Sequence, residues 1–231
     1  MTARAAAASR ARRQVTGGGP AADSVRRRWV IAAATSVGGA GLLGISLSTE
    51  ADSPQFYALT LGLAGTWAAG ALAVGPLEPG RANNLRDALR RQVAGPVLTG
   101  AGTFGLFYGA ARLARYIPPL SRAIGSALHY ADHGSTRLVP LTAGANAVAE
   151  ELFFRGALWS LAGESSPIVK TTLAYAATVA ATRNPALLLA GTATSVIFGL
   201  QRRASGGFLA PALAHLTWSQ LMLRYLPRPA P

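Results

Sequence analysis

Two adjacent carboxylates and an arginine stand in the middle of an apolar part of the sequence. Glu150, Glu151 and Arg155 are the three charges of the run 138–163. A charge at membrane depth costs about 3 kcal/mol on insertion scales, so such residues are functional candidates by default. On a helix, Glu151 and Arg155 have the spacing and order that favour an ion pair, whereas Glu150 points about 100° away. We therefore expect Glu151 to be neutralised and Glu150 to stay free as a general base.

Other polar and aromatic residues share helix faces with these candidates. Asn146 and Phe154 lie one turn before and one turn after Glu150, and we interpret them as supporting residues. His215 and Ser219 are also four residues apart, in the last apolar run, which gives a second polar group at similar depth. The alternative for all of these residues is a buried polar network that only fixes helix packing.

A separate pair, His129 and His133, has the i,i+4 spacing with which a helix can bind a metal ion. The segment reads as loop-like, ends in Gly134-Ser135, and is predicted on the opposite side of the membrane from the carboxylates. We therefore favour an interpretation without a metal site here.

The composition places the chain in the membrane class. Of its 231 residues, 50% are hydrophobic and 13% are charged, against about 25% charged in an ordinary soluble domain. This composition argues strongly against a soluble enzyme and excludes a disordered protein. The net charge is +13, but the basic residues lie between apolar runs, where membrane proteins place loop anchors, so we expect a lipid bilayer and no nucleic acid as partner. The chain has no cysteine, and Lys170 is its one lysine; with the many Ala and Gly residues this suggests a bacterial source.

The apolar runs predict an all-α, polytopic transmembrane helix bundle of about seven spans, with six to eight as the range. The runs are 29–48, 53–77, 92–111, 138–163, 171–182, 184–201 and 204–223. Residues 1–28 are predicted to be a disordered basic tail, cytoplasmic because it holds seven arginines. Residues 29–137 then form the N-terminal transmembrane helices and loops, and 138–226 form the core helices that hold the candidate residues. The segment 112–137 is predicted outside although it holds four arginines, so an interfacial amphipathic helix is an alternative to a free loop there.

Two segments of the predicted core resemble known motifs. Glu150–Gly156 (EELFFRG) is similar to the Glu-Glu-x-x-x-Arg motif of the CPBP intramembrane protease family, which contains the CAAX prenyl endopeptidases of the Rce1 type and bacterial Abi proteins. His215–Ser219 (HLTWS) resembles the family's last motif, with Ser219 where Asn or Asp is usual, and residues 199–207 resemble the basic turn before it. The resemblance covers roughly residues 138–226.

This resemblance implies an endopeptidase that acts on a membrane-associated protein or peptide in the bacterial cytoplasmic membrane. Glu150 would then activate the attacking water, Glu151 and Arg155 would support it, and His215 would be a further polar group. Zinc is possible by resemblance, with His215 and Glu150 as ligands. That ligand set is short of the three protein ligands that catalytic zinc usually has.

The family's middle motif, an aromatic residue followed four residues later by His, is degenerate. Tyr175 with Val179 is the better candidate by sequence, and Phe198 with Arg202 is the alternative, so one His is missing in either case. This leaves three functions open. They are an active endopeptidase, a catalytically silent scaffold or immunity-type membrane protein, and a small proton-coupled transporter.

Overall fold

The computed structural model describes residues 20–82 and 84–226, and this part of the chain is helical, without a strand. The all-α prediction is therefore confirmed. In chain order the elements are α2 (Pro20–Ser46), α3 (Pro54–Val74), α4 (Leu85–Leu89), η1 (Arg90–Ala94), α5 (Gly95–Ala114), α6 (Pro118–His133), α7 (Leu138–Glu151), η2 (Leu152–Leu158), α8 (Trp159–Ala162), α9 (Pro167–Val179), η3 (Ala180–Thr182), α10 (Pro185–Ser205) and α11 (Leu209–Tyr225).

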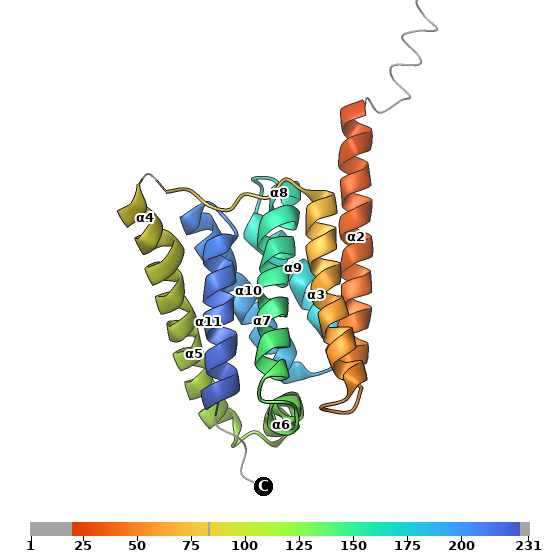
Figure 1. Ribbon diagram of the computed structural model, residues 1–231, viewed down its shortest axis with the longest axis vertical. Helices are drawn as coiled ribbons and strands as arrows, with labels where there is room; N and C mark the ends of the chain where they lie inside the picture. Colours follow the sequence, from red (N-terminus) through yellow and green to blue (C-terminus); the bar gives the residue numbers. More distant parts are fainter. Residues whose placement is uncertain (1–19, 83, 227–231) are drawn as a thin grey trace, which may run out of the picture.

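The long helices lie side by side, and α6 lies across one end of them (Figure 1). Helix α3 packs against α2 and α7, α11 packs against α5 and α7, and α10 pairs with α9. Helix α8 and the segment between α3 and α4 are at the end opposite α6 (Figure 1). The helices that hold the candidate residues, α7, α9, α10 and α11, therefore form one connected packing unit.

Local sequence signals set the helix ends. Ser53 caps α3, and its hydroxyl accepts the N–H of Phe56 at 3.1 Å. Asn184 caps α10 in the same way, accepting the N–H of Leu187 at 3.0 Å, so the predicted break before Pro185 is confirmed. Helix α10 ends at Gly206, whose φ of 71° suits glycine and strains other residues.

An aromatic cluster forms the centre of the bundle. Trp67 of α3 has its ring centroid 5.1 Å from those of both Phe153 and Phe154, which follow the candidate carboxylates. The same indole lies against Gly39 of α2, where an added Cβ would fall 2.2 Å from it. Small residues let transmembrane helices approach closely, and Gly39 permits this α2–α3 contact.

The polarity of the molecule is inverted relative to a water-soluble protein. Large apolar side chains such as Val37, Leu72 and Leu98 are more than 70% exposed on the outside of α2, α3 and α5. Glu151 and Arg155, in contrast, are buried in the interior. By length and composition, two helices of the described chain, at Ala21–Ser46 and Pro54–Val74, can cross a membrane.

The structure corrects three expectations. Helix α2 begins at Pro20, so residues 20–28 are helical and not part of a disordered tail; residues 1–19 lie outside the described residues. The loop-like interpretation of His129–His133 is wrong, because α6 runs to His133, and the helical alternative is confirmed. The apolar run 184–201 was expected to end before Arg202, but α10 continues to Ser205, and the break before α11 falls at Gly206-Gly207, within the predicted break at residues 202–207.

Candidate active site

Glu151, the last residue of α7, is fully buried and has two basic partners. Its Oε1 lies 3.2 Å from Nη1 of Arg155 and 3.0 Å from Nδ1 of His215 on α11. The ion pair predicted from the i,i+4 spacing is thus present. It spans the start of η2, a π-helical stretch of a kind that often occurs at functional sites.

Arg155 joins Glu151 to two other helices. Its Nη2 donates to the main-chain oxygen of Ser195 in α10 at 2.9 Å, and its guanidinium lies 5.4 Å from the ring centroid of Tyr175 in α9. A cation over an aromatic face is attracted by the ring quadrupole. Arg155 therefore fixes the relative positions of α7, α9 and α10 around the carboxylates.

Glu150 has different surroundings from its neighbour. It is half-buried, and its Oε2 accepts the hydroxyl hydrogen of Tyr175 at 2.7 Å. No ion-pair partner lies within 4 Å of Glu150 in the described part of the chain. The Tyr175 ring meets Phe154 edge-on, with centroids 4.9 Å apart, so Tyr175 is itself held in place. The geometry thus separates the two carboxylates into one that is paired with charges and one that is oriented by a neutral hydroxyl.

His215 was predicted beside Glu150; in the structure it lies close enough to Glu150 to interact with its charge, but its direct hydrogen bond is to Glu151. The reason is the rotation of α7: α11 packs on the face that carries Gly144, where an added Cβ would lie 3.1 Å from Leu216. The imidazole also lies against Phe198, with ring centroids 5.0 Å apart. An ionised Glu151 accepts a hydrogen from Nδ1, which leaves Nε2 of His215 as the nitrogen for other partners.

The predicted supporting residues are placed unevenly. Asn146 donates from Nδ2 to the main-chain oxygens of Thr60 and Thr142, each at 2.9 Å, so it ties α7 to α3 and turns away from the carboxylates. Ser219 is half-buried one turn after His215 on α11. Phe154 and Tyr175, as described above, contact each other next to Glu150.

Residues 133–221 match the family model for type II CAAX prenyl endopeptidase Rce1-like proteins. We call residues 133–221 the Rce1-like segment, because the similarity to this family covers that part of the chain. It contains both carboxylates, Glu150 and Glu151, and the side chains that contact them. Rce1-like proteins are membrane-embedded, in agreement with the apolar outer surface of the bundle. Comparisons with curated proteins and with solved structures give no match.

Arg202 and Glu78, which the sequence analysis did not include among the site residues, extend the polar network of the Rce1-like segment to the surface. Arg202 is buried, and its Nε donates to the main-chain oxygen of Arg155 at 2.7 Å. Its Nη2 lies 2.6 Å from Oε2 of Glu78, whose side chain is 54% exposed. We call His215, Glu151, Arg155, Arg202 and Glu78 the polar chain. Arg202 had a signal, its place in the degenerate motif, whereas Glu78 lies in an irregular segment with no motif.

The two candidates for the middle motif have different contacts in the structure. Val179 belongs to the apolar cluster around Trp67, and an added Cβ at Gly191 would lie 3.3 Å from it. Phe198 instead contacts His215, and Arg202, four residues later, belongs to the polar chain. The candidate that the sequence favoured less thus lies in the polar network, with Arg in place of the family's second His.

The residues of the Rce1-like segment do not fit a catalytic zinc ion. His215 and Glu150 were the predicted ligands, yet Nδ1 of His215 is committed to Glu151, and the adjacent Arg155 guanidinium would repel a cation. Within residues 20–82 and 84–226 no three His, Asp or Glu side chains are grouped to hold a metal ion. His129 and His133 face each other, with ring centroids 4.3 Å apart, but they make only a pair.

Proposed function

We propose that this chain is an intramembrane endopeptidase that hydrolyses a peptide bond of a membrane-associated protein or peptide. One observation supports this most: two adjacent carboxylates have different partners. Glu151 is held by Arg155 and His215, whereas Glu150 accepts a hydrogen bond from the Tyr175 hydroxyl. Such a division is expected where one carboxylate positions other groups and the other handles protons.

In this mechanism Glu150 takes a proton from a water molecule while the water oxygen adds to the carbonyl carbon of the substrate. The hydroxyl of Tyr175 orients the Glu150 carboxylate through its 2.7 Å hydrogen bond. When the C–N bond breaks, the leaving nitrogen takes a proton, and the carboxyl of Glu150 is regenerated as carboxylate. A positioned base of this kind contributes about 10²–10⁴ in rate.

His215 acts on the other side of the reacting carbonyl. Glu151 fixes the imidazole through Nδ1 and stabilises its protonated form, so Nε2 can donate a hydrogen to the oxyanion or to the leaving nitrogen. Arg155 balances the charge of Glu151 when His215 is neutral. The role of Glu151 is therefore to position His215 and to stabilise its protonated form.

We further propose a topology of about seven spans in a bacterial cytoplasmic membrane. The spans would be α2, α3, α5 with η1, α7 with η2 and α8, α9, α10 and α11, with α6 at the interface. The arginines 26–28 at the start of α2 favour a cytoplasmic N-terminal end. The α8 end, near the start of α2 in Figure 1, would then face the cytoplasm. Glu78, in the segment at that end, would bring the polar chain to the cytoplasmic surface.

A catalytically silent membrane protein is the second candidate, and Arg202 favours it. This guanidinium is buried and bonded at the position where the family has a His, so a group of the family's site is replaced by a structural one. Such a chain would bind a membrane-associated partner without cleaving it.

Proteolysis by purified protein in proteoliposomes separates the two candidates. Wild type is compared with Glu150→Gln, which keeps the shape and the acceptor for Tyr175 but cannot take a proton. Glu164→Gln is the matched control, because Glu164 is exposed in the turn before α9. Membrane peptides cut by wild type and by the control, but at least about 100-fold more slowly by Glu150→Gln, would support the mechanism. Equal rates in all three would remove Glu150 as the base, and no cleavage by folded wild type would favour the silent protein.

A further inference from the structure

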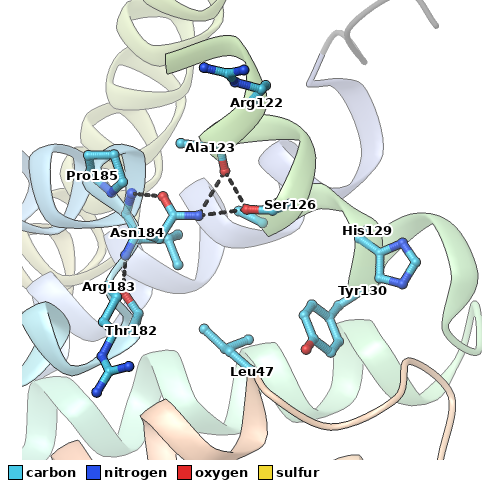
Figure 2. Close-up of a pocket in the computed structure, with 12 residues that line it drawn as sticks. Leu47, Arg122, Ala123, Ser126, His129, Tyr130, Thr182, Arg183, Asn184 and Pro185 are labelled. Atoms are coloured by element: carbon cyan, nitrogen blue, oxygen red, sulfur yellow. Dashed lines mark hydrogen bonds between the residues drawn. The ribbon is translucent and has the colours of Figure 1, made fainter. Parts of the chain in front are cut away.

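A pocket lies at the end of the bundle that α6 covers, away from the carboxylates. It has a volume of about 550 Å³ and is enclosed by α6, the end of α2 and the junction between α9 and α10 (Figure 2). Its walls include Leu47, Arg122, Ser126, His129, Arg183 and Leu187. None of these belongs to the polar chain, so the pocket needs its own explanation.

The charged side chains that line this pocket are all basic. Arg122 comes from α6 and Arg183 from the α9–α10 junction, with His129 on a third side, and no acidic residue is among the lining residues. Within the described chain neither guanidinium has a hydrogen-bond or ion-pair partner in this structure. Figure 2 shows the two arginines on different sides of the pocket, with Asn184 between them. Unpaired basic groups around one cavity favour an anionic ligand.

Hydrogen bonds hold the walls of the pocket together before any ligand binds. Asn184 donates from Nδ2 to the main-chain oxygen of Ala123 at 2.8 Å and to the hydroxyl of Ser126 at 3.0 Å, which ties α10 to α6. Tyr130 donates to the main-chain oxygen of Thr49 at 2.9 Å, which ties α6 to the α2–α3 turn. A site that is already formed loses less entropy on binding.

The surroundings of the pocket fit a boundary between lipid and water. At the corner between α5 and α6, Leu113, Tyr116 and Ile117 are 70%, 69% and 53% exposed. Aromatic and apolar side chains next to arginines are typical of the headgroup level of a bilayer. Leu47 and Leu187 add apolar walls to the pocket itself. The ligand should therefore combine a negative charge with an apolar part.

We propose that this pocket binds an anionic phospholipid, with the headgroup phosphate in the pocket that Arg122 and Arg183 line and the acyl chains directed to the apolar outside of the bundle. Basic pockets between membrane helices bind anionic headgroups on the cytoplasmic side of membranes, and the same attraction between guanidinium and phosphate acts at the opposite end. The inference does not depend on peptidase activity. An inactive chain with this fold would bind the same lipid.

The test measures lipid retention by the purified full-length chain in detergent micelles. Phosphatidylglycerol and phosphatidylcholine with the same acyl chains are titrated separately, and bound lipid is counted by native mass spectrometry. The double variant Arg122→Gln/Arg183→Gln removes both pocket arginines. Arg115→Gln/Arg137→Gln is the matched control, because these arginines flank α6 but do not line the pocket. Melting in phosphatidylcholine checks that both variants are folded.

We expect wild type and the control to retain one phosphatidylglycerol in preference to phosphatidylcholine. The pocket variant should bind it about 30-fold more weakly, since each arginine near an anionic headgroup contributes about fivefold. Equal binding of both lipids by wild type, or an equal loss in the control variant, would overturn the proposal. In a final experiment, inorganic phosphate is added at matched ionic strength as a competitor. If phosphate displaces the lipid at the same concentration, the site binds free phosphate instead.

Discussion

Arg155→Ala is expected to destabilise the protein strongly, because it leaves the fully buried Glu151 without its arginine. The lost pair has its atoms 3.2 Å apart and side chains that are 1% and 0% exposed. Breaking one side of such a pair costs about 3–5 kcal/mol. The Ser195 oxygen also loses a donor, but its place inside α10 leaves it a helical partner, so the carboxylate dominates the cost. At about 2–4 °C per kcal/mol for a chain of this size, the melting temperature should fall by about 6–20 °C.

Thermal unfolding of the purified protein in detergent measures this effect. Arg203→Ala is the matched control, since Arg203 is the same residue type, exposed on α10, and should change stability by less than about 0.5 kcal/mol. The double variant Glu151→Gln/Arg155→Met removes both charges and should recover most of the loss. If Arg155→Ala has the same melting temperature as Arg203→Ala, the Glu151–Arg155 pair is not buried, and the helix that carries it is wrongly placed. If the double variant melts as low as Arg155→Ala, lost packing and not an unpaired charge is the cause.

Three further predictions follow from contacts around the site. Tyr175→Phe keeps the ring but removes the hydrogen bond to Glu150, so the cleavage rate should fall about tenfold with a stability loss of about 1 kcal/mol; an unchanged rate would show that the hydroxyl does not orient the base. Val179→His places an imidazole in the apolar cluster, so it should lower the melting temperature without raising zinc content, and elemental analysis that finds one zinc per wild-type chain would contradict the metal-free site. A double-mutant cycle of Glu78→Gln and Arg202→Gln should give a coupling energy of about 1–3 kcal/mol in thermal unfolding, and a value near zero would mean that the pair contributes nothing.

The sequence predicted those parts of the site that depend on a single helix. The Glu151–Arg155 pair follows from spacing of four residues, and the break at Pro185 follows from the chemistry of proline. The partner of His215 could not be predicted, because it depends on how α7 and α11 are rotated against each other, and the apolar residues on both helices permit more than one rotation. Glu78 was missed for a related reason. It lies in a segment without regular structure, and only the tertiary fold brings it to α10.

Some helix ends could also be predicted from the sequence, and others could not. The apolar runs 53–77, 171–182 and 184–201 located α3, α9 and α10 within a few residues. The start of α2 was missed, since the basic residues 26–28 were assigned to a tail although arginine is a good helix former. The segment His129–His133 was interpreted as loop-like because Gly134-Ser135 follow it, whereas α6 runs to His133 and contacts α10.

The bond between Arg202 and Glu78 has a consequence for how the sequence of such a protein can diverge. A buried arginine at position 202 is tolerated because an acid from a distant loop reaches it. A histidine in its place, as in the family motif, can be neutral and needs no such acid. Positions 78 and 202 should therefore change together during evolution, acid with arginine and other residues with histidine. If a related protein has histidine at position 202, an acid at position 78 has no arginine to pair with, and other residues should be tolerated there.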